Sequence, residues 1–589
     1  MARELSTKLH ECVTQIATKK TVTEYSRPWI SAEVSSQLKH LRRLRRKYRL
    51  RRSPRNKTEL SKAQEETIHI IQKAEQEWWL LECSRLSNVS EAAKWNIINK
   101  LTNQSKFSGI KPIRKVINGQ NVFLFEDEEI RSEMEEYHIR KGHSQDITVT
   151  AQQNEIYPDI DNVGKSVLNE RMDSVLNGVI LDREVKNTFG KGTDTPGPDG
   201  ISASMLDKAD RELMHSCLML LWNEAWLSGR FINEWKEENR VVIPKPSRED
   251  YHDCSAYRTI SITSCLGKRF EHITSQRLIS VLTEVNFDKD QFAYLKNRSS
   301  THAILTLVEN IKKGLICGES AGAVFFDLTD AFGSVNRSHL LNKISSHFGT
   351  SGYLLQHISS FLQNRIARIK IDDTVGEWIQ SEYGTSAGTR LGPLLFIIHL
   401  HDIPKCIKPK FADDLVVFAV GKDICEIQRS LQEATDQLVK WTTKEGMTIN
   451  AAKTKVMLFG DRSDIIDIRI HDKTIENVRS YKYLGVILDP MLDFGWQVDY
   501  AIGKAKKEHS KVCTLINGRQ GILVQLGIQL HKTLVRTQLE YAMPAWASIS
   551  EKDQEKLDKL QVQCLRRIIG AKAHSSSSSV EVICGTVPV

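Results

Sequence analysis

The stretch FADDLVVFAV (411–420) sets two adjacent aspartates, Asp413 and Asp414, among apolar residues. Like charges this close resist joint ionisation, so such a pair is costly in a buried place unless a cation neutralises it. A second apolar stretch, AGAVFFDL (321–328), also carries an acid near its end, Asp327. If both stretches are neighbouring strands, the three carboxylates meet and suit Mg²⁺ and phosphoryl transfer. Two aspartates alone would more often mark a β-turn, and the second acidic strand favours the metal site.

The residues around these stretches have the patterns of short strands and helices in irregular order. Because strands and helices do not alternate as a strict repeat, we expect an α+β fold rather than a doubly wound sheet. Apolar spacing predicts the further elements. The strands are VVIPK (241–245), YRTISITS (257–264), KVMLFG (455–460) and YKYLGVILD (481–489), and the helices are 266–283, 394–400 and 424–441.

The segments on either side have helical patterns. Residues 1–108 contain no glycine, and 57–86 has helical composition and period. The texture then turns loop-rich, so we place a domain boundary near 150–175. Residues 495–570 are again helical in pattern, and HSSSSS (574–579) is a low-complexity segment that we expect to be a linker.

The positive charge of the chain is concentrated in one block. The formal net charge is +9, and residues 39–57 hold eleven Lys and Arg and no acid, so the remainder is close to neutral. Such a block indicates a polyanion, most often nucleic acid, because each neutralised phosphate releases a counterion. A solvated helix face or a nuclear-import signal explains the block alone equally well. The residues of the expected nucleic-acid tether are Arg42, Arg43, Arg45, Arg46, Lys47, Arg49, Arg51 and Arg52.

Composition excludes several classes of protein. No apolar run approaches the roughly 20 residues of a membrane-spanning helix, and the N-terminus lacks the apolar block of a secretory signal. We therefore expect an intracellular protein, in the nucleus, the cytoplasm or both, with no membrane partner. The 11 cysteines include no C-x-x-C pair, which excludes a zinc knuckle or ribbon and makes reduced, buried thiols the expectation.

Nine motifs over about 180–490 occur in an order that resembles the reverse transcriptases of non-long-terminal-repeat retrotransposons, the jockey-like group in particular. The resemblance implies a right-hand polymerase, with fingers and a ferredoxin-like antiparallel palm at 176–460 and a primer-grip hairpin and helical thumb at 461–573. It also implies a mostly helical, basic N-terminal extension or linker at 1–175, and a Ser-rich linker with a truncated tail at 574–589. The motifs are GPDGIS (197–202), VVIPK (241–245), YRTIS (257–261), QFAYLKNRSSTHA (291–303), FFDLTDAFGSVN (325–336), AGTRLGPLLF (387–396), FADD (411–414), NAAKTKVMLFG (450–460) and YKYLGVILD (481–489).

The resemblance implies a role for each acid. Asp327 and Asp413 would bridge two metal ions, Asp414 would assist, and the backbone carbonyl of Leu328 would complete one coordination sphere. The ions would be two Mg²⁺, with Mn²⁺ as an alternative. Lys453 matches a motif lysine that acts as general acid toward pyrophosphate, and a surface lysine is almost as good an interpretation.

Five further residues match the nucleotide-binding positions of the family. Lys245 and Arg258 would grip the triphosphate from neighbouring strands, and surface cations on a hairpin are the alternative. Phe332 would close against C2′ of the sugar and so select deoxynucleotides, unless it is a core phenylalanine. Asp330 would line the same place, and Gly388 would let the backbone pass close to template and nucleotide.

Template and primer positions follow from two more motifs. QFAYLKNRSS resembles the segment that tracks the template, and YKYLGVILD resembles the hairpin that positions the primer terminus. The chain departs from the family where Ser386 and Ala387 replace its usual Pro and Gln, which weakens the case for a side-chain contact to the template there. The implied residues are Gln291, Lys296 and Arg298 for the template, and Tyr483, Leu484 and Gly485 for the primer.

The function that the resemblance implies is an RNA-directed DNA polymerase that adds dNTPs to a primer 3′-hydroxyl on an RNA template. Its partners would be the RNA template, a DNA primer or target, and dNTPs, while the sequence identifies no protein partner. A catalytically decayed or co-opted copy that only binds nucleic acid is the alternative, which the three intact acids disfavour, and Phe332 disfavours an RNA-templated RNA polymerase. We find no endonuclease in 1–175 and no ribonuclease H after 574–579, so we expect a polymerase-containing piece of an element's reading frame.

Overall fold

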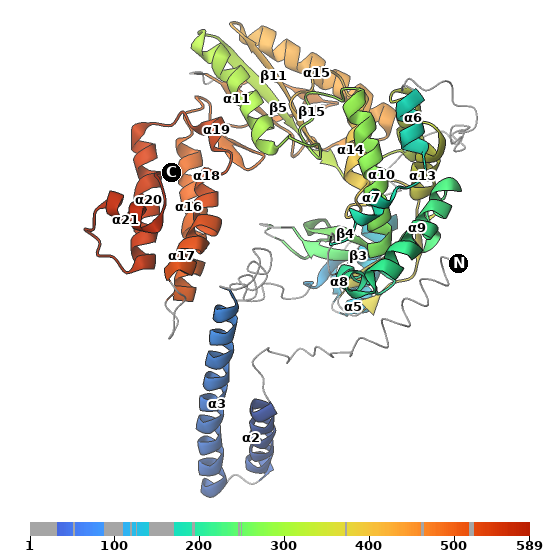
Figure 1. Ribbon diagram of the computed structural model, residues 1–589. Helices are drawn as coiled ribbons and strands as arrows, with labels where there is room; N and C mark the ends of the chain where they lie inside the picture. The colour runs from blue at the N-terminus through green and yellow to red at the C-terminus, as the bar shows by residue number, and fades with distance from the viewer. Residues whose placement is uncertain are drawn as a thin grey trace. The chain divides into compact units, whose positions relative to one another are not determined.

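The structure of the protein is a computed structural model (Figure 1). The chain divides into two compact units. The first holds Ser108–Phe494 and Ala542–Ser548, and the second holds Thr18–Phe107, Gly495–Tyr541 and Ile549–Val589. The structure describes residues 32–50, 53–86, 110–117, 120–124, 126–140, 170–190, 195–245, 248, 250–371, 374–460, 465–516 and 524–589.

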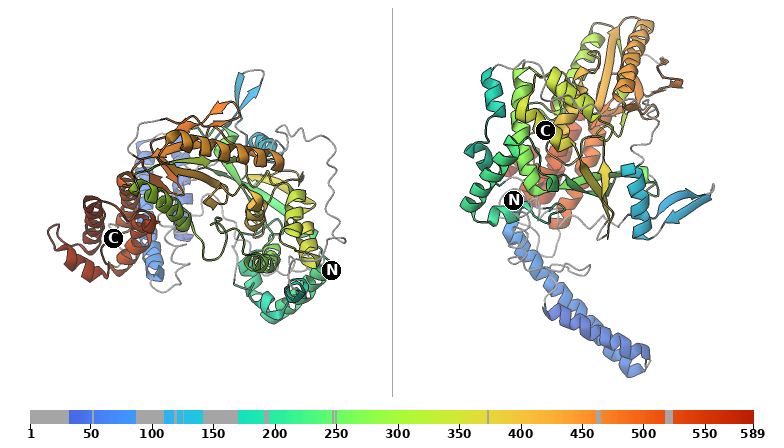
Figure 2. Two further views of the ribbon diagram at one scale, coloured as in Figure 1. Left: turned by 90° about the horizontal axis from the view of Figure 1, so that it is seen from above. Right: turned by 90° about the vertical axis from the view of Figure 1, so that its right-hand side faces the viewer.

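The basic block lies in a helical hairpin of the second unit. Its helices, α2 (Ala32–Leu50) and α3 (Pro54–Leu86), lie side by side in every view (Figures 1 and 2). Leu41 and Leu44 of α2 are buried at their contact. Lys47 of α2 pairs with Glu59 of α3 at 2.8 Å. The helix predicted over 57–86 is confirmed, with an earlier start at Pro54.

The two acidic strands are neighbours in a five-stranded sheet, the palm sheet, with the order β10-β11-β5-β13-β16. It is antiparallel except for the β13–β16 pair, so the prediction of an α+β fold with an antiparallel palm is confirmed. The central strand β5 is buried along its whole length, because helices cover both faces of the sheet (Figure 1). Helix α15 packs on one face, against Gly322 of β5, and helix α11 packs on the other, against Val420 of the neighbouring strand β11. The bounds are α11 (Ser300–Ile316), β5 (Ser320–Phe326), β10 (Lys410–Phe411), β11 (Asp414–Gly421), α15 (Ile424–Glu445), β13 (Lys455–Phe459) and β16 (Glu476–Asn477).

A second five-stranded sheet, the fingers sheet, lies in the same unit. Its order is β4-β3-β7-β8, and β9 also pairs with β7. The β3–β7 pair is parallel and the other pairs are antiparallel. Helix α5 packs on β7, where Ile130 and Met134 are buried against Ile369. The bounds are β1 (Ile113–Ile117), β2 (Gln120–Leu124), α5 (Asp127–Glu135), η1 (Glu136–Arg140), β3 (Glu237–Pro244), η5 (Cys254–Ala256), β4 (Tyr257–Thr263), β7 (Arg365–Ile371), β8 (Thr374–Val375) and β9 (Ile379–Ser381).

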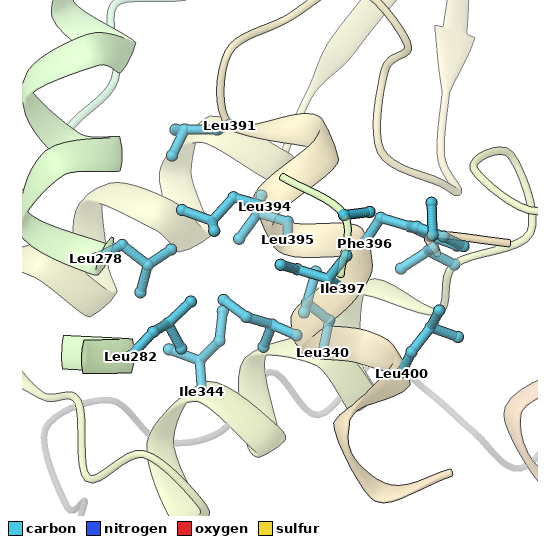
Figure 3. Packing of buried hydrophobic residues seen from close by; sticks show 14 of the residues in the cluster. Leu278, Leu282, Leu340, Ile344, Leu391, Leu394, Leu395, Phe396, Ile397 and Leu400 are labelled. Carbon is cyan, nitrogen blue, oxygen red and sulfur yellow. The ribbon is translucent and has the colours of Figure 1, made fainter. Parts of the chain in front are cut away.

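A helical core supports the palm sheet. Helix α14 is buried all around, which explains the uniformly apolar sequence LLFIIHL. Figure 3 shows side chains of α10, α12 and α14 meeting there, namely Leu278 and Leu282, Leu340 and Ile344, and Leu394, Leu395 and Phe396. The bounds are α6 (Glu170–Asn177), α7 (Asp182–Lys186), α8 (Ala203–Lys208), α9 (Arg211–Leu227), η4 (Asn233–Trp235), α10 (Cys265–Glu284), α12 (Arg337–Ser346), α13 (Gly352–Leu362), α14 (Gly392–His399) and η6 (Leu400–Asp402).

Three short strand pairs complete the first unit. The predicted strand 481–489 is a hairpin, because Leu484 and Gly485 adopt positive φ and turn the chain between β17 and β18. The pairs are β6 (Leu328–Thr329) with β12 (Thr448–Ile449), β14 (Arg469–Ile470) with β15 (Lys473–Thr474), and β17 (Tyr481–Tyr483) with β18 (Val486–Leu488).

The C-terminal part is helical, as predicted, but its Ser-rich segment is not a linker. Residues Ser577–Cys584 form helix α21, which packs on α20 and buries Val580 and Cys584. The buried side of that helix is formed by apolar residues after the serines. The prediction of a linker considered only the serines. The described helices include none that is long and apolar enough to cross a bilayer. The bounds are α16 (Gly495–Ile516), α17 (Val524–Leu530), η7 (His531–Val535), α18 (Arg536–Glu540), α19 (Met543–Trp546), α20 (Glu551–Ile569) and α21 (Ser577–Cys584).

Candidate active site

The register of the palm sheet brings the two acidic strands together at one end. Phe326 of β5 pairs with Leu415 of β11. Asp327 follows Phe326 and Asp414 precedes Leu415, so these two acids come opposite each other where the antiparallel pairing ends. Asp413 lies beside them, in the turn that joins β10 to β11. The three predicted carboxylates therefore gather at the same end of the sheet.

Gln291 holds the turn that carries Asp413. Phe411 pairs with Asp414, which leaves Ala412, with φ of 54°, and Asp413 as the central residues of a tight turn. The Ala412 N–H donates to Oε1 of Gln291 at 3.1 Å. Gln291 is only 1% exposed, so it supports the acidic turn and does not track a template as predicted.

The three carboxylates repel one another. Burial raises the pKa of Asp413, and the charge of Asp327 raises it further. Burial also raises the pKa of Asp414 to about 6, with added repulsion from Asp413 and Asp327, although part of the Asp414 side chain stays exposed. Acids in this state gain from a bound cation, which would release their protons and relieve the repulsion.

Lys453 lies beside Asp327. Its ammonium group is 3.1 Å from Asp327 Oδ2. The turn before β13 brings it there, because the Asn450 N–H donates to the backbone carbonyl of Asp327 at 2.7 Å. The two charged side chains are 51% and 39% exposed, so their pairing contributes little to stability. The proposed general acid is thus next to the carboxylates, and its chemical role stays a prediction.

The donor set fits a divalent cation. Three carboxylates supply the hard oxygen ligands that Mg²⁺ prefers, and the raised pKa values of Asp413 and Asp414 reflect charge that a cation would neutralise. The carbonyl of Leu328 follows Asp327 at the start of β6. Among the described residues, no three His, Cys, Asp or Glu side chains already stand close enough to hold an ion.

One of the two predicted triphosphate cations lies within electrostatic range of the acids. The Lys245 ammonium donates to the carbonyl of Ser255 at 2.8 Å. Burial lowers the pKa of Lys245, and Lys453 lowers it further, while Asp327 acts in the opposite direction. Arg258 is exposed on the neighbouring strand β4 and forms no ion pair with any residue of the described ranges. Neither side chain is neutralised by an acid in an ion pair within those ranges, and the role of both in binding the triphosphate stays a prediction.

Asp330 and Phe332 lie in the turn after β6. Burial raises the pKa of Asp330, and nearby cations act against this. A Cβ at Gly333 would lie 2.2 Å from Asp330 Oδ2, so a side chain there would displace the Asp330 carboxylate. The Phe332 ring stacks on Phe396 of α14, with centroids 4.4 Å apart and planes at 22°. One face of Phe332 therefore belongs to the core, and its contact with a sugar stays a prediction.

Gly388 makes a close approach to protein backbone. Its φ is +117°, and a Cβ would lie 2.2 Å from the carbonyl oxygen of Ser261 on β4. The Ser261 N–H donates to the Ala387 carbonyl at 2.8 Å. Ser386 is buried, and its hydroxyl helps to lower the pKa of the buried Glu238 carboxyl on β3. The segment is thus attached to the fingers sheet, which gives Gly388 and the unusual Ser386 a reason other than the predicted approach to template and nucleotide.

Arg298 is bound within the protein. Its guanidinium donates to the carbonyls of Asp288, Gln291 and Phe287. These bonds to three carbonyls fix the loop before Gln291, and the contact of Arg298 with a template stays a prediction. Lys296 is exposed and stays a candidate for the template.

The hairpin of β17 and β18 contributes aromatic residues behind the acids. Tyr483, predicted to meet the primer, is 2% exposed and lies on Phe325, with ring centroids 5.6 Å apart, so it serves the core. Leu484 and Gly485 form the hairpin tip. Tyr481, which sequence reasoning missed, stacks on Phe325 at 4.1 Å, and burial with the charges of the nearby acids raises its pKa to about 12. The alternation of tyrosines in YKY was the available signal.

The tether residues fall partly within the described chain. Arg42, Arg43, Arg45, Arg46, Lys47 and Arg49 belong to α2, while Arg51 and Arg52 lie outside the described residues. Arg43 is exposed, and the exposed Lys47 is engaged with Glu59. The basic residues lie in the second unit and the acids in the first.

Comparison with known proteins points to one family. Residues 243–488 match the family described as reverse transcriptase (RNA-dependent DNA polymerase). The chain is 27% identical over 386 residues to the RNA-directed DNA polymerase from mobile element jockey of Drosophila funebris, covering 63% of this chain and 42% of the relative. It is 25% identical over 430 residues to the jockey enzyme of Drosophila melanogaster, covering 70% and 46%. The chain thus spans less than half the length of these relatives.

Solved structures of telomerase are also similar. Apo telomerase from Candida tropicalis, truncated from its C-terminal domain, has 12% sequence identity and a TM-score of 0.31, with 47% of this chain and 59% of that chain covered. Telomerase from Candida albicans with a fragment of telomeric RNA has 11% identity and a TM-score of 0.33, with 64% and 71% covered.

Proposed function

We propose that this chain, whose residues 243–488 form a reverse transcriptase domain related to those of jockey elements, is the RNA-directed DNA polymerase of a non-long-terminal-repeat retrotransposon. The observation that carries the proposal is the meeting of Asp327, Asp413 and Asp414 at one end of the palm sheet, inside the matched residues. The reaction joins the primer 3′-hydroxyl to the α-phosphate of a dNTP and releases pyrophosphate.

The acids would hold two Mg²⁺ ions, with Mn²⁺ as an alternative, and the Leu328 carbonyl would add a ligand. Bound there, the ions would lower the pKa of the primer hydroxyl and stabilise charge on the triphosphate. Gln291 orients the turn that carries Asp413. Lys453, 3.1 Å from Asp327, would release that carboxylate and give a proton to the pyrophosphate oxygen.

The substrate would be held by side chains at the fingers sheet and in the turn after β6. Lys245 and Arg258 would bind triphosphate oxygens, and Arg258 can do so with two parallel hydrogen bonds. Phe332, fixed by its stacking on Phe396, would leave no room for a 2′-hydroxyl. The basic helix α2 would add a salt-sensitive grip on RNA template or target DNA.

Primer extension tests the proposal. The whole chain is assayed on poly(rA) with an oligo(dT) primer, dTTP and Mg²⁺, as wild type and as Asp413→Ala. Asp436→Ala, which removes an exposed acid of α15 on the same unit, is the matched control. We expect DNA synthesis by wild type and Asp436→Ala and none by Asp413→Ala.

The same samples separate the alternative function. Binding of the primer–template by wild type without any synthesis, in Mg²⁺ or Mn²⁺, would overturn the polymerase proposal. It would instead favour a decayed or co-opted copy that only binds nucleic acid. Equal synthesis by wild type and Asp413→Ala would show that the acids are not the catalytic group.

A further inference from the structure

A single segment, residues 384–391, is held by three different parts of the first unit. At its start, the Thr385 N–H donates to the carbonyl of Phe332 at 2.8 Å. In its middle, the Ala387 carbonyl accepts from the Ser261 N–H at 2.8 Å. At its end, one oxygen of Glu271 accepts from the N–H groups of Arg390 at 2.6 Å and Leu391 at 3.2 Å. The polymerase reaction itself gives Glu271 no role.

Glu271 is a buried carboxylate of one helix that accepts hydrogen bonds from the residues that precede another helix. It belongs to α10, is 1% exposed, and forms no ion pair with any residue in the described part of the chain. Burial raises its pKa, and the two backbone N–H groups act against that rise. Helix α14 starts at Gly392 without a side-chain cap from its preceding residue, Leu391. Glu271 therefore accepts, from α10, the N–H groups of the two residues that lead into α14, while the Thr389 hydroxyl accepts that of Gly392 at 3.1 Å.

The start of α14 controls the position of Phe332. Phe396, one turn into α14, stacks on the Phe332 ring, and Figure 3 shows Leu391, just before α14, and Phe396 on it in one packed cluster. The Phe332 backbone is tied to the other end of the segment through Thr385. Phe332 is thus fixed at its carbonyl by the segment and at its ring by α14, the helix that follows the residues bound by Glu271.

We propose that Glu271 is a positioning residue of the nucleotide site, which sets the Phe332 ring, and with it sugar selection, by fixing the start of α14. The inference rests on the proposed polymerase function. Glu271 contacts no substrate and acts only through Arg390 and Leu391. Loss of its carboxylate leaves two N–H groups at a buried helix start unsatisfied, so the first turn of α14 shifts and Phe396 moves with it.

The experiment compares Glu271→Ala, Glu271→Gln and the control Glu184→Gln. Glu184 also contacts α10 through a buried side chain, Arg277, but touches nothing in 384–391. The readouts are KM and kcat for dTTP and the ratio of dTTP to UTP incorporation, each normalised to the active fraction. For Glu271→Ala we expect the ratio to fall about tenfold, the size of one missing hydrogen bond, with kcat changed less than about threefold.

Glu271→Gln keeps one acceptor oxygen, so its ratio falls between wild type and Glu271→Ala. Glu184→Gln lowers the melting temperature and leaves the ratio unchanged. An unchanged ratio in Glu271→Ala, with a lowered melting temperature, would overturn the inference and leave Glu271 a purely structural residue.

A second readout does not require polymerase activity. Hydrogen exchange of the peptides covering 385–396 and 327–336 should quicken in Glu271→Ala and not in Glu184→Gln. If wild type makes no DNA, the proposed function fails, and the exchange result still decides whether Glu271 fixes this segment. Unchanged exchange in both peptides would refute the positioning role directly.

Discussion

The palm sheet and the fingers sheet treat their acids in opposite ways. In the fingers sheet, Glu238 is fully buried, and Arg240 at 2.8 Å and Arg365 at 3.4 Å outweigh the effect of burial and lower its pKa to about 2. In the palm sheet, burial and mutual repulsion raise the pKa of Asp414 to about 6. The first acid helps to hold the fold, while the second weakens it until a cation binds. A charge that the protein leaves uncompensated is therefore the better sign of function.

The largest expected effect concerns an acid of the palm sheet. Asp414→Asn removes one of the three carboxylates that would hold the metal ions. We therefore expect primer extension to fall by at least about a hundredfold, the cost of removing a charge-stabilising group. The melting temperature without Mg²⁺ should stay equal or rise, because the repulsion is relieved. Steady-state extension and thermal unfolding measure the two results. A clearly lower melting temperature would mean that Asp414 supports the fold.

The corresponding substitution in the fingers sheet is Glu238→Gln. It leaves the guanidinium of Arg365, 1% exposed, without its compensating charge, so we expect a loss of about 3–5 kcal/mol of stability. Urea unfolding, followed by far-UV circular dichroism, measures it, with Asp414→Asn as the control that should not lose stability. A loss below about 1 kcal/mol would show that the two sheets do not differ in this respect.

The next prediction concerns Phe332, which lies in the same turn as Asp330 and packs on α14. Phe332→Val removes the ring that would exclude a 2′-hydroxyl, so we expect the preference for dTTP over UTP to fall by about 10- to 100-fold. Incorporation of UTP on poly(rA) measures the change, and Phe292→Val, at another half-buried phenylalanine, is the control. Unchanged sugar preference would make Phe332 a core residue only.

Stability should depend on pH with opposite sign in the two sheets. The pKa of Asp414 rises from 3.8 to about 6 on folding, so the folded state binds more protons between these values and its contribution to stability falls as pH rises through them. The pKa of Glu238 falls from 4.5 to about 2, so its contribution is present above pH 4.5 and is lost as pH falls toward 2. Melting curves of wild type against Asp414→Asn and Glu238→Gln, without Mg²⁺, test both signs. Parallel pH profiles for wild type and either variant would contradict the assignment for that acid.

The smallest expected effect concerns the basic hairpin. Neutralising the exposed Lys39 and Arg43 to Gln should lower the salt dependence of single-stranded RNA binding by a slope of about 1.4, because each phosphate that the protein neutralises adds about 0.7 to that slope. Fluorescence anisotropy over a range of salt measures the slope. Lys422→Gln with Lys473→Gln removes the same charge from exposed sites in the first unit. An equal change in both double variants would assign the effect to net charge rather than to α2.

The positions of the main elements could be predicted because burial leaves few alternatives. Strands β5 and β11 are covered on both faces, so their apolar runs are unbroken, and α15 carries a regular apolar stripe that also predicts it. The meeting of Asp327 with Asp413 and Asp414 followed from the same reasoning, since Asp327 ends one apolar run and Asp413 and Asp414 directly precede another. A prediction that depends on local burial needs no knowledge of distant partners.

The side-chain contacts that sequence reasoning missed depend on partners that no local pattern reveals. Gln291 reaches a backbone N–H 121 residues away, at Ala412. Arg298 was expected to meet a template because its motif resembles the segment that tracks the template, and no local pattern shows that three carbonyls of one loop engage it. Ser386 was judged by what it replaced, whereas its hydroxyl acts on the pKa of Glu238, which lies on a strand far along the chain.

In its C-terminal part the chain passes between the two compact units after Phe494, before Ala542 and after Ser548. Helix α19, in the returning piece, packs on α11 and contains Trp546, which is fully buried. A graft that replaced everything after Phe494 would therefore remove a buried part of the first unit and bare the side of α11 that α19 covers. The C-terminal helices cannot be exchanged as a cassette unless the incoming segment brings its own replacement for α19. Replacing the chain at that point would therefore destabilise the first unit even if the acids were untouched.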